Sequence, residues 1–328
     1  MEVYLKSVKY KRLGSLLLLF VFFFCSMDKN APAQEAGDSV NITSSGLDFS
    51  KDIIMRGSVS LPKVKRLQIW GNAYMAGGSL SPNLSDGSNI DFDNDIKGVV
   101  LGANISLLGG TVSGWYNYNQ CDLDFNPFSS SQKTNLGGIS YFRKISNIYI
   151  SLLGNYGLDS YALDGLAAGS STDFDGYQAN GFFEVGFEMM RGGFFVFKPF
   201  SSLLYDHLVY EPESEKEKCK AFYSTTGARI DLNLAGLDTF TFQIRGAWAH
   251  QLLSDEDPIT TYYYGRIPGS ITPTQLLYEG DFGKDYFWGG AGLRFSIKKM
   301  FSFAIDYDLL TNHQQTTHIG SIGILASF

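Results

Sequence analysis

Residues Thr316–Phe328, with the sequence TTHIGSIGILASF, carry the pattern that decides the fold. In an extended chain successive side chains point to opposite faces, so residues two apart share a face. From residue 318 onward, one face holds His318, Gly320, Ile322, Ile324, Ala326 and Phe328, and the other holds Ile319, Ser321, Gly323, Leu325 and Ser327. The segment stops at an aromatic residue, whereas chain ends are usually polar and frayed. It is therefore predicted to be a long β-strand whose last residue belongs to the sheet.

The same alternation recurs from residue 66 onward. In residues 301–310, Phe301, Phe303, Ile305, Tyr307 and Leu309 oppose Ser302, Ala304, Asp306 and Asp308. Such runs have the length of a tilted strand that crosses a bilayer, whereas a soluble strand has about five or six residues. The pattern predicts an all-β, antiparallel up-and-down transmembrane barrel. About twelve strands are expected, near residues 66–76, 97–108, 111–124, 134–145, 148–161, 175–190, 194–210, 219–234, 239–253, 284–298, 301–310 and 316–328.

The connections between these strands alternate in length. Gly109-Gly110 and Ser146-Asn147 have the composition of tight turns. Longer polar stretches lie near residues 77–96, 125–133, 162–174 and 254–283. Outer-membrane barrels show this asymmetry, with short periplasmic turns and long extracellular loops. A secreted β-sandwich is the soluble alternative, but it offers no reason for the alternation.

Residues 1–33 are predicted to be a secretory signal peptide. Basic residues from Lys6 to Arg12 precede the apolar run 16–24, and Ala31-Pro32-Ala33 is a small-x-small cleavage site. The apolar run is shorter than the roughly 20 residues of a membrane helix. An N-terminal membrane anchor is the alternative. The mature chain is expected to begin near Gln34 and to reach the outer membrane of a Gram-negative bacterium.

Composition supports the barrel and excludes other classes. The chain has 36 Gly, 26 Phe and 19 Tyr, and 18% of its residues are charged, which suits strands that alternate apolar and polar residues. A net charge of −7 argues against nucleic acid as a partner. Beyond the predicted signal peptide there are two cysteines, Cys121 and Cys219, on strands far apart around the barrel, so both thiols are expected to be unpaired.

Aromatic residues with a polar edge are expected at the membrane–water interfaces, because their rings sit well at headgroup level. The candidates near strand ends are Tyr116, Tyr118, Tyr156, Tyr161, Tyr205, Tyr210, Trp248 and Tyr286.

The face opposite the apolar one is predicted to line the lumen. A charge that faced lipid would cost about 2–4 kcal/mol near the bilayer midplane, so the charged residues of the strands must point inward. These lumen-facing charges are Glu184, Glu188, Lys198, Arg229, Asp231, Arg245, Arg294, Asp306 and Asp308. Two roles are open for them, namely mutual pairing across strands, or holding a segment in the pore and setting its ion preference.

Several motifs in sequence order resemble the C-terminal translocator domain of autotransporters. They are Gln68–Tyr74 (QIWGNAY) with Gly77-Gly78, Lys97–Ala103 (KGVVLGA), Asp175–Tyr177 (DGY), Lys198–Tyr205 (KPFSSLLY) and the terminal Phe328. The resemblance covers residues 66–328. It implies a twelve-stranded barrel with one helix in the pore. It also implies insertion by the outer-membrane barrel assembly machinery, for which Phe328 is the signal.

The chain departs from this family upstream of the barrel, where autotransporters carry a long passenger. Here residues 34–65 separate the predicted cleavage site from the first strand, and residues 47–56 (LDFSKDIIMR) are predicted to form a short pore helix capped by Asp48 or Ser50. The expected function is a barrel that holds or passes this short segment.

Three other functions stay open at this point. They are a porin-like channel for small solutes, an adhesin acting through residues 254–283, and an outer-membrane hydrolase using His250, Ser254 and Asp255. We expect no enzymatic activity, because three residues in one polar loop do not make a triad. No phosphate loop, cofactor fingerprint or full metal-ligand set is recognisable, so we expect neither cofactor nor metal. The expected surroundings are outer-membrane lipid and lipopolysaccharide, with the protein as a monomer.

Overall fold

The computed structural model describes residues 67–80, 83–84, 92–125, 128–164, 171–191, 194–210, 217–233, 240–256, 263–265, 274–276, 280–281, 285–297, 300–313 and 315–328. The chain divides into two units, Met1–Ala36 and Gly37–Phe328, and all described residues belong to the second. The predicted signal peptide (residues 1–33) and the predicted linker with its short helix (residues 34–65) lie outside the described residues.

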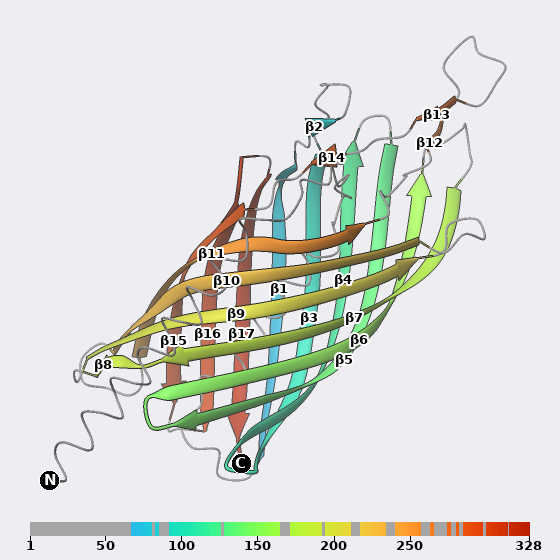
Figure 1. The fold of residues 1–328 in the computed structure, drawn as a ribbon. Helices are drawn as coiled ribbons and strands as arrows, with labels where there is room; N and C mark the ends of the chain where they lie inside the picture. The colour runs from blue at the N-terminus through green and yellow to red at the C-terminus, as the bar shows by residue number, and fades with distance from the viewer. Residues whose placement is uncertain are drawn as a thin grey trace, which may run out of the picture. The chain divides into compact units, whose positions relative to one another are not determined.

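Twelve long antiparallel strands close into a barrel (Figure 1). They are β1 (Leu67–Leu80), β3 (Phe92–Leu107), β4 (Gly110–Phe125), β5 (Phe128–Ile145), β6 (Ile148–Asp164), β7 (Ser171–Phe187), β9 (Phe195–Tyr210), β10 (Glu217–Asn233), β11 (Phe240–Glu256), β15 (Asp285–Ile297), β16 (Phe301–Thr311) and β17 (Gln315–Ser327). Each long strand pairs with the next along the chain, and β17 pairs with β1. The prediction of an all-β, up-and-down barrel of about twelve strands is confirmed.

Short strands accompany the barrel. They are β2 (Asn83–Leu84), β8 (Met189–Arg191), β12 (Tyr263–Gly265), β13 (Thr274–Leu276) and β14 (Gly280–Asp281). β8 pairs with β9, whereas β12 pairs with β13 and β2 with β14 outside the barrel sheet. Among the described residues, no helix is long and apolar enough to cross a membrane.

The barrel closes along the seam between β1 and β17. Their register runs without a break from Gln68 opposite Ser327 to Leu80 opposite Gln315. Beyond the last pair, the backbone N–H of Phe328 donates to the carbonyl of Leu67 at 3.0 Å. The final residue is thus bonded to the first strand, which leaves neither strand with a free edge.

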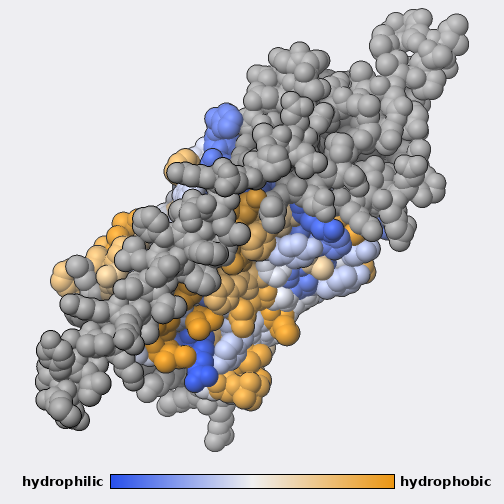
Figure 2. All heavy atoms as spheres, viewed as in Figure 1, coloured by the Kyte–Doolittle hydropathy of each residue, from blue (hydrophilic) through white to orange (hydrophobic). Residues whose placement is uncertain are grey.

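The outer surface of the barrel is apolar. Ile305 of β16 and Ile322 of β17 lie opposite each other, and each is 60% exposed. Their sequence neighbours Asp306 and Ser321, on the other face, are each 5% exposed. Figure 2 shows patches of hydrophobic side chains, in orange, beside hydrophilic ones, in blue, on the visible part of the described surface. This is the arrangement expected where lipid, rather than water, surrounds a sheet.

Several strands extend further than the sequence predicted, on the side of the long loops. β5 begins at Phe128 instead of near 134, and β7 begins at Ser171 instead of near 175. Ser129 of β5, for example, pairs with Asp164 of β6. Backbone pairing continues here although the residues are polar on both faces, so the apolar alternation that marks a membrane strand is missing.

The predicted interfacial aromatics are only partly on the outer face. Tyr116, Tyr118, Tyr156, Tyr205 and Trp248 are exposed there. Tyr286 instead packs against buried interior side chains, and the hydroxyl of Tyr161 accepts a hydrogen bond from the buried Gln132. The prediction was wrong for Tyr286, because a position near a strand end does not fix the face to which a ring points.

Candidate functional site: the barrel interior

The charged residues of strands β7 to β16 lie on the strand faces that point into the barrel. In β11, Gln243 and Arg245 are buried, while Ile244 between them is 43% exposed. The same alternation applies to the other strands. Inward positions are taken by Glu184 of β7, Lys198 of β9, Arg229 and Asp231 of β10, Arg245 of β11, Arg294 of β15, and Asp306 and Asp308 of β16. Glu188 lies at the break between β7 and β8, not within a strand as predicted.

Arg245 is almost fully enclosed, because only 3% of its surface is exposed. Its Nε and Nη2 donate to the two carboxylate oxygens of Asp308 at 2.6 and 2.7 Å, and its Nη1 donates to Asp306 at 2.9 Å. The Arg245 guanidinium also lies over the ring of Trp288, 5.7 Å from its centroid. A two-point pair to one carboxylate plus a bond to a second gives a buried guanidinium a geometry that offsets its loss of hydration.

Two glycines of the intervening strand make this cluster sterically feasible. Arg245 reaches from β11 across β15 to β16, and Gly290 and Gly292 lie beneath the contact. A Cβ on Gly290 would come within 1.9 Å of Asp308 Oδ1, and one on Gly292 within 2.0 Å of Asp306 Oδ1. Any side chain at these positions would displace the carboxylates.

A second buried pair joins β10 to β7. Arg229 donates from Nη1 and Nη2 to the two oxygens of Glu184 at 2.7 and 2.9 Å, and Nη1 also donates to the Tyr149 hydroxyl at 3.0 Å. The guanidinium carbon lies 4.0 Å from the centroid of the Phe200 ring. These contacts fix the Arg229 side chain in one orientation.

Polar side chains connect the remaining charges into one series. Gln243 accepts from Arg245 at 3.3 Å and donates to Asp231 at 2.6 Å, and Asp231 pairs with Lys198 at 2.5 Å. Lys198 Nζ is 4.0 Å from Glu188, which also forms an ion pair with Lys144. We call the charges that were predicted to line the lumen the charged wall; they are Glu184, Glu188, Lys198, Arg229, Asp231, Arg245, Arg294, Asp306 and Asp308.

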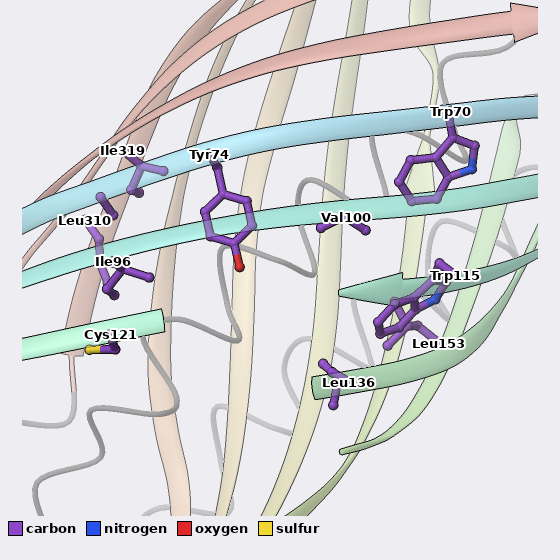
Figure 3. Close-up of a cluster of buried hydrophobic side chains, with 11 residues drawn as sticks. Trp70, Tyr74, Ile96, Val100, Trp115, Cys121, Leu136, Leu153, Leu310 and Ile319 are labelled. Atoms are coloured by element: carbon purple, nitrogen blue, oxygen red, sulfur yellow. The ribbon is translucent and has the colours of Figure 1, made fainter. Parts of the chain in front are cut away.

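On the other arc of the barrel, a cluster of apolar side chains lies in the interior beside buried polar ones such as Gln68, Asn104 and Asn117, and the sequence did not predict this cluster. Figure 3 shows this cluster, which we call the apolar wall. Its members are at most 8% exposed and come from β1, β3, β4, β5, β6, β16 and β17; they are Trp70, Tyr74, Ala76, Ile96, Val100, Trp115, Cys121, Leu136, Leu153, Leu310 and Ile319. Cys121 is a free thiol, as predicted, and the side chain of Cys219 lies outside the described residues.

A sequence signal for the apolar wall exists in its aromatic residues, each paired with a glycine on the next strand. Tyr74 of β1 pairs with Gly98 of β3, and a Cβ on Gly98 would lie 2.2 Å from the Tyr74 ring. Further pairs of this kind are Trp70 with Gly102, Trp115 with Gly138 and Tyr149 with Gly186. The ring lies flat over the neighbouring strand because the glycine leaves room for it.

The interior also contains a polar group that the sequence analysis did not select. Asp159 of β6 is 1% exposed, and its Oδ1 accepts hydrogen bonds from Thr134, Gln178 and Gln132 at 2.6, 2.9 and 3.2 Å. Its membership of the interior could have been read from its place in the alternation of residues 148–161. The absence of an ion-pair partner for Asp159 among the described residues could not be predicted, because it depends on the side chains of the neighbouring strands.

Of the three residues weighed for a hydrolase, only His250 has a described side chain. His250 Nδ1 lies 2.8 Å from Asp285 Oδ1, so the carboxylate beside this ring belongs to β15 and is not Asp255. The side chains of Ser254 and Asp255 lie outside the described residues. His318 Nδ1 lies 2.7 Å from the Tyr307 hydroxyl. In the described part of the chain, no group of three or more His, Cys, Asp or Glu side chains is placed to hold a metal ion.

A closed twelve-stranded antiparallel barrel with an apolar exterior is the architecture of the outer-membrane β-barrels. A family model described as the autotransporter beta-domain matches residues 69–308. The chain belongs to the autotransporter beta-domain family, and it is an outer-membrane protein of the Gram-negative type.

Solved translocator barrels have the same fold. The translocator domain of the autotransporter NalP from Neisseria meningitidis is 12% identical, with a TM-score of 0.64 over 87% of this chain and 97% of that one. The β-domain of the Bordetella autotransporter BrkA is 14% identical, with a TM-score of 0.60 over 80% and 100%. The transport unit of AIDA-I from Escherichia coli is 12% identical, with a TM-score of 0.59 over 85% and 97%. A search of curated protein sequences found no significant match.

Proposed function

We propose that this barrel holds, or passes, a short polypeptide segment in its lumen, and that the segment is residues 34–65 of the same chain. The observation that carries the proposal is that the interior is lined by clusters of buried apolar side chains as well as by buried ion pairs. An open solute channel is lined by polar groups and water. An interior with both kinds of wall instead suits an occupant that has both kinds of side chain.

Residues 34–65 have this mixed character. Residues 47–56 contain Leu47, Phe49, Ile53, Ile54 and Met55 together with Lys51, Asp52 and Arg56. As a helix, ten residues would span about 15 Å, roughly half the thickness of the hydrocarbon core. Because β1 follows directly at Leu67, this segment is covalently tied to the barrel wall that it would contact.

Export and assembly complete the proposal. Residues 1–33 direct export as a signal peptide, and the barrel assembly machinery inserts the chain through its last strand, with Phe328 as the signal. In the membrane the barrel is a monomer, surrounded by lipid and, in the outer leaflet, by lipopolysaccharide. The exposed apolar band and the exposed aromatics Tyr116, Tyr156 and Trp248 support this environment.

Single-channel conductance in planar bilayers tests the proposal. The refolded mature protein is compared with a variant that lacks residues 34–65. We expect a low or intermittent conductance for the mature protein and a large, steady conductance for the deletion variant. A matched control deletes a similar number of residues from the long loop 254–283, which is not expected to open the pore.

Equal and steady conductance in the mature protein and the deletion variant would contradict the proposal and favour the porin-like alternative. If the deletion variant fails to refold, a cysteine in place of Ser50 provides a second readout. Blockage of its labelling by a bulky water-soluble maleimide, relieved on unfolding, is expected for a segment inside the lumen.

A further inference from the structure

An inward-facing carboxylate that is not a member of the charged wall lies on β6. Asp159 lies near the loop end of β6, and its sequence neighbour Leu158 is 59% exposed on the lipid side. The Asp159 side chain therefore points inward, and it is 1% exposed. None of the ion pairs formed between described residues includes Asp159, whereas Glu184 and Asp308 each have an arginine.

The two oxygens of Asp159 have different surroundings. Oδ1 is saturated, because it accepts from the Thr134 hydroxyl and from the side-chain amides of Gln178 and Gln132. Oδ2 is buried and has no hydrogen-bond partner. Three neutral donors on one oxygen orient the carboxylate and hold its second oxygen toward the interior.

Neutral donors do not balance a buried charge. The cost of burying an isolated carboxylate is several kcal/mol or more, and proteins meet it with an opposite charge or by protonation. Protonation would remove the charge, but a hydrogen on Oδ2 would itself need an acceptor. A cation at Oδ2 would satisfy both the charge and the unpaired oxygen.

We propose that Asp159 is a lumen-side binding site for a single positively charged group, which contacts Oδ2. The cation has two sources with the same chemistry. One is a free inorganic cation in the water of the pore. The other is an ammonium or guanidinium group from the segment before β1, where the sequence places Lys51, Arg56, Lys63, Lys65 and Arg66; this source rests on the proposed function.

The test is a comparison of melting midpoints for the refolded mature protein in detergent micelles. Asp159→Asn removes the charge and keeps the shape, and Asp175→Asn is the matched control. Asp175 is exposed on the neighbouring strand and accepts a hydrogen bond from Ser160 at 3.1 Å. Each protein is melted in sodium chloride, in calcium chloride, and in choline chloride with a chelator.

We expect Asp159→Asn to lower the midpoint by about 5 °C or more in the buffer that supplies the cation, and Asp175→Asn to leave it unchanged. For a free cation, the wild-type midpoint falls to that of Asp159→Asn in choline chloride, and the variant does not respond. If the cation is a side chain of this protein, the wild-type melting midpoint is the same in all three salts. Replacing the five basic residues with glutamine then lowers the midpoint of the wild type but not that of Asp159→Asn.

A midpoint for Asp159→Asn that equals or exceeds the wild-type midpoint in every buffer would overturn the proposal, because removing an unmatched charge would then be harmless. If Asp159→Asn does not refold, the test uses the melting midpoints of the wild type and of the variant with the five basic residues replaced. A wild-type midpoint that responds to neither the salt nor the five replacements also overturns it. If the conductance experiment contradicts the proposed function, only a side chain of the segment before β1 is excluded as the cation. The response to free cations is measured separately and still tests the site.

Discussion

Arg229 of β10 crosses β9 to form a two-point ion pair with Glu184 of β7, with distances of 2.7 and 2.9 Å between the paired atoms. Glu184 is 1% exposed, so the pair is shielded from solvent. Since the two strands are not neighbours in the sheet, this contact adds a link that backbone hydrogen bonding does not provide. It links β7 to β10 on the inner surface of the barrel.

Breaking this pair on one side is expected to destabilise the barrel strongly. Arg229→Met leaves the Glu184 carboxylate buried without a counter-charge, which costs about 3–5 kcal/mol. The measurement is the free energy of unfolding from urea titration of the protein in lipid vesicles. The double variant Glu184→Leu with Arg229→Met removes both charges and is expected to recover most of the loss. Equal losses in the single and double variants would show that the packing of the side chains, and not the charge, matters here.

Gly290 is expected to tolerate no side chain. In Gly290→Ala the new Cβ meets Asp308 Oδ1 at 1.9 Å and the Tyr307 carbonyl at 2.7 Å, so the contact between Asp308 and Arg245 is displaced. Overpacking of this kind costs about 1–3 kcal/mol. Gly289→Ala is the control, because its nearest contact is 3.9 Å away. The measurement is the urea midpoint of unfolding of each variant relative to the wild type. A decrease of the same size in both variants would contradict the steric argument.

Two tryptophans with similar surroundings are expected to respond differently to replacement by phenylalanine. Trp70 Nε1 donates to Asn104 at 2.8 Å, whereas Trp115 Nε1 is buried without a partner. Trp70→Phe removes a buried hydrogen bond and is expected to cost about 1–2 kcal/mol more than Trp115→Phe. Both side chains are at most 6% exposed, so the loss of packing is comparable. The difference in unfolding free energy is the readout, and a larger cost for Trp115→Phe would be inconsistent with this account.

A charge on the lipid-facing side should be costly in proportion to its depth. Ile305→Arg, in the middle of β16, is expected to cost about 2–4 kcal/mol in vesicles. Asp173→Arg, near the loop end of β7, is expected to cost about 0–1 kcal/mol, because the cost falls near the interfaces. Folding yield and unfolding free energy in vesicles of one lipid measure both. A negligible cost for Ile305→Arg would mean that this surface does not face lipid.

The sequence predicted the exterior better than the interior. Ile305 and Ile322 could be assigned to the lipid-facing side because their sequence neighbours Asp306 and Ser321 are polar. Apolar and polar residues therefore alternate strictly at these positions. Leu136 was missed because an apolar residue on the inner face breaks that contrast without leaving a sign of its own. Trp70 was missed because its glycine partner, Gly102, lies on another strand and is recognised only once the register is known. The ends of several strands were also missed. Backbone pairing, as at Ser129, continues beyond the region where side chains contact lipid, so the apolar alternation does not mark it.

The partners of the interior charges could not be predicted either. Arg245 and Asp308 are 63 residues apart, and their contact depends on the register of three strands and on a glycine between them. The sequence indicates that charges face inward, but the pairing follows from the closed geometry.

The seam between β1 and β17 has a consequence for the time course of folding. The two strands lie at opposite ends of the described chain, so that Gln68 bonds to Ser327 across 259 positions. Contacts at such separation form late, because the entropy of closing a long loop must be overcome first. Until then both strands present unpaired backbone groups, which attract other chains. The final closure is therefore the interval in which this protein is most exposed to aggregation.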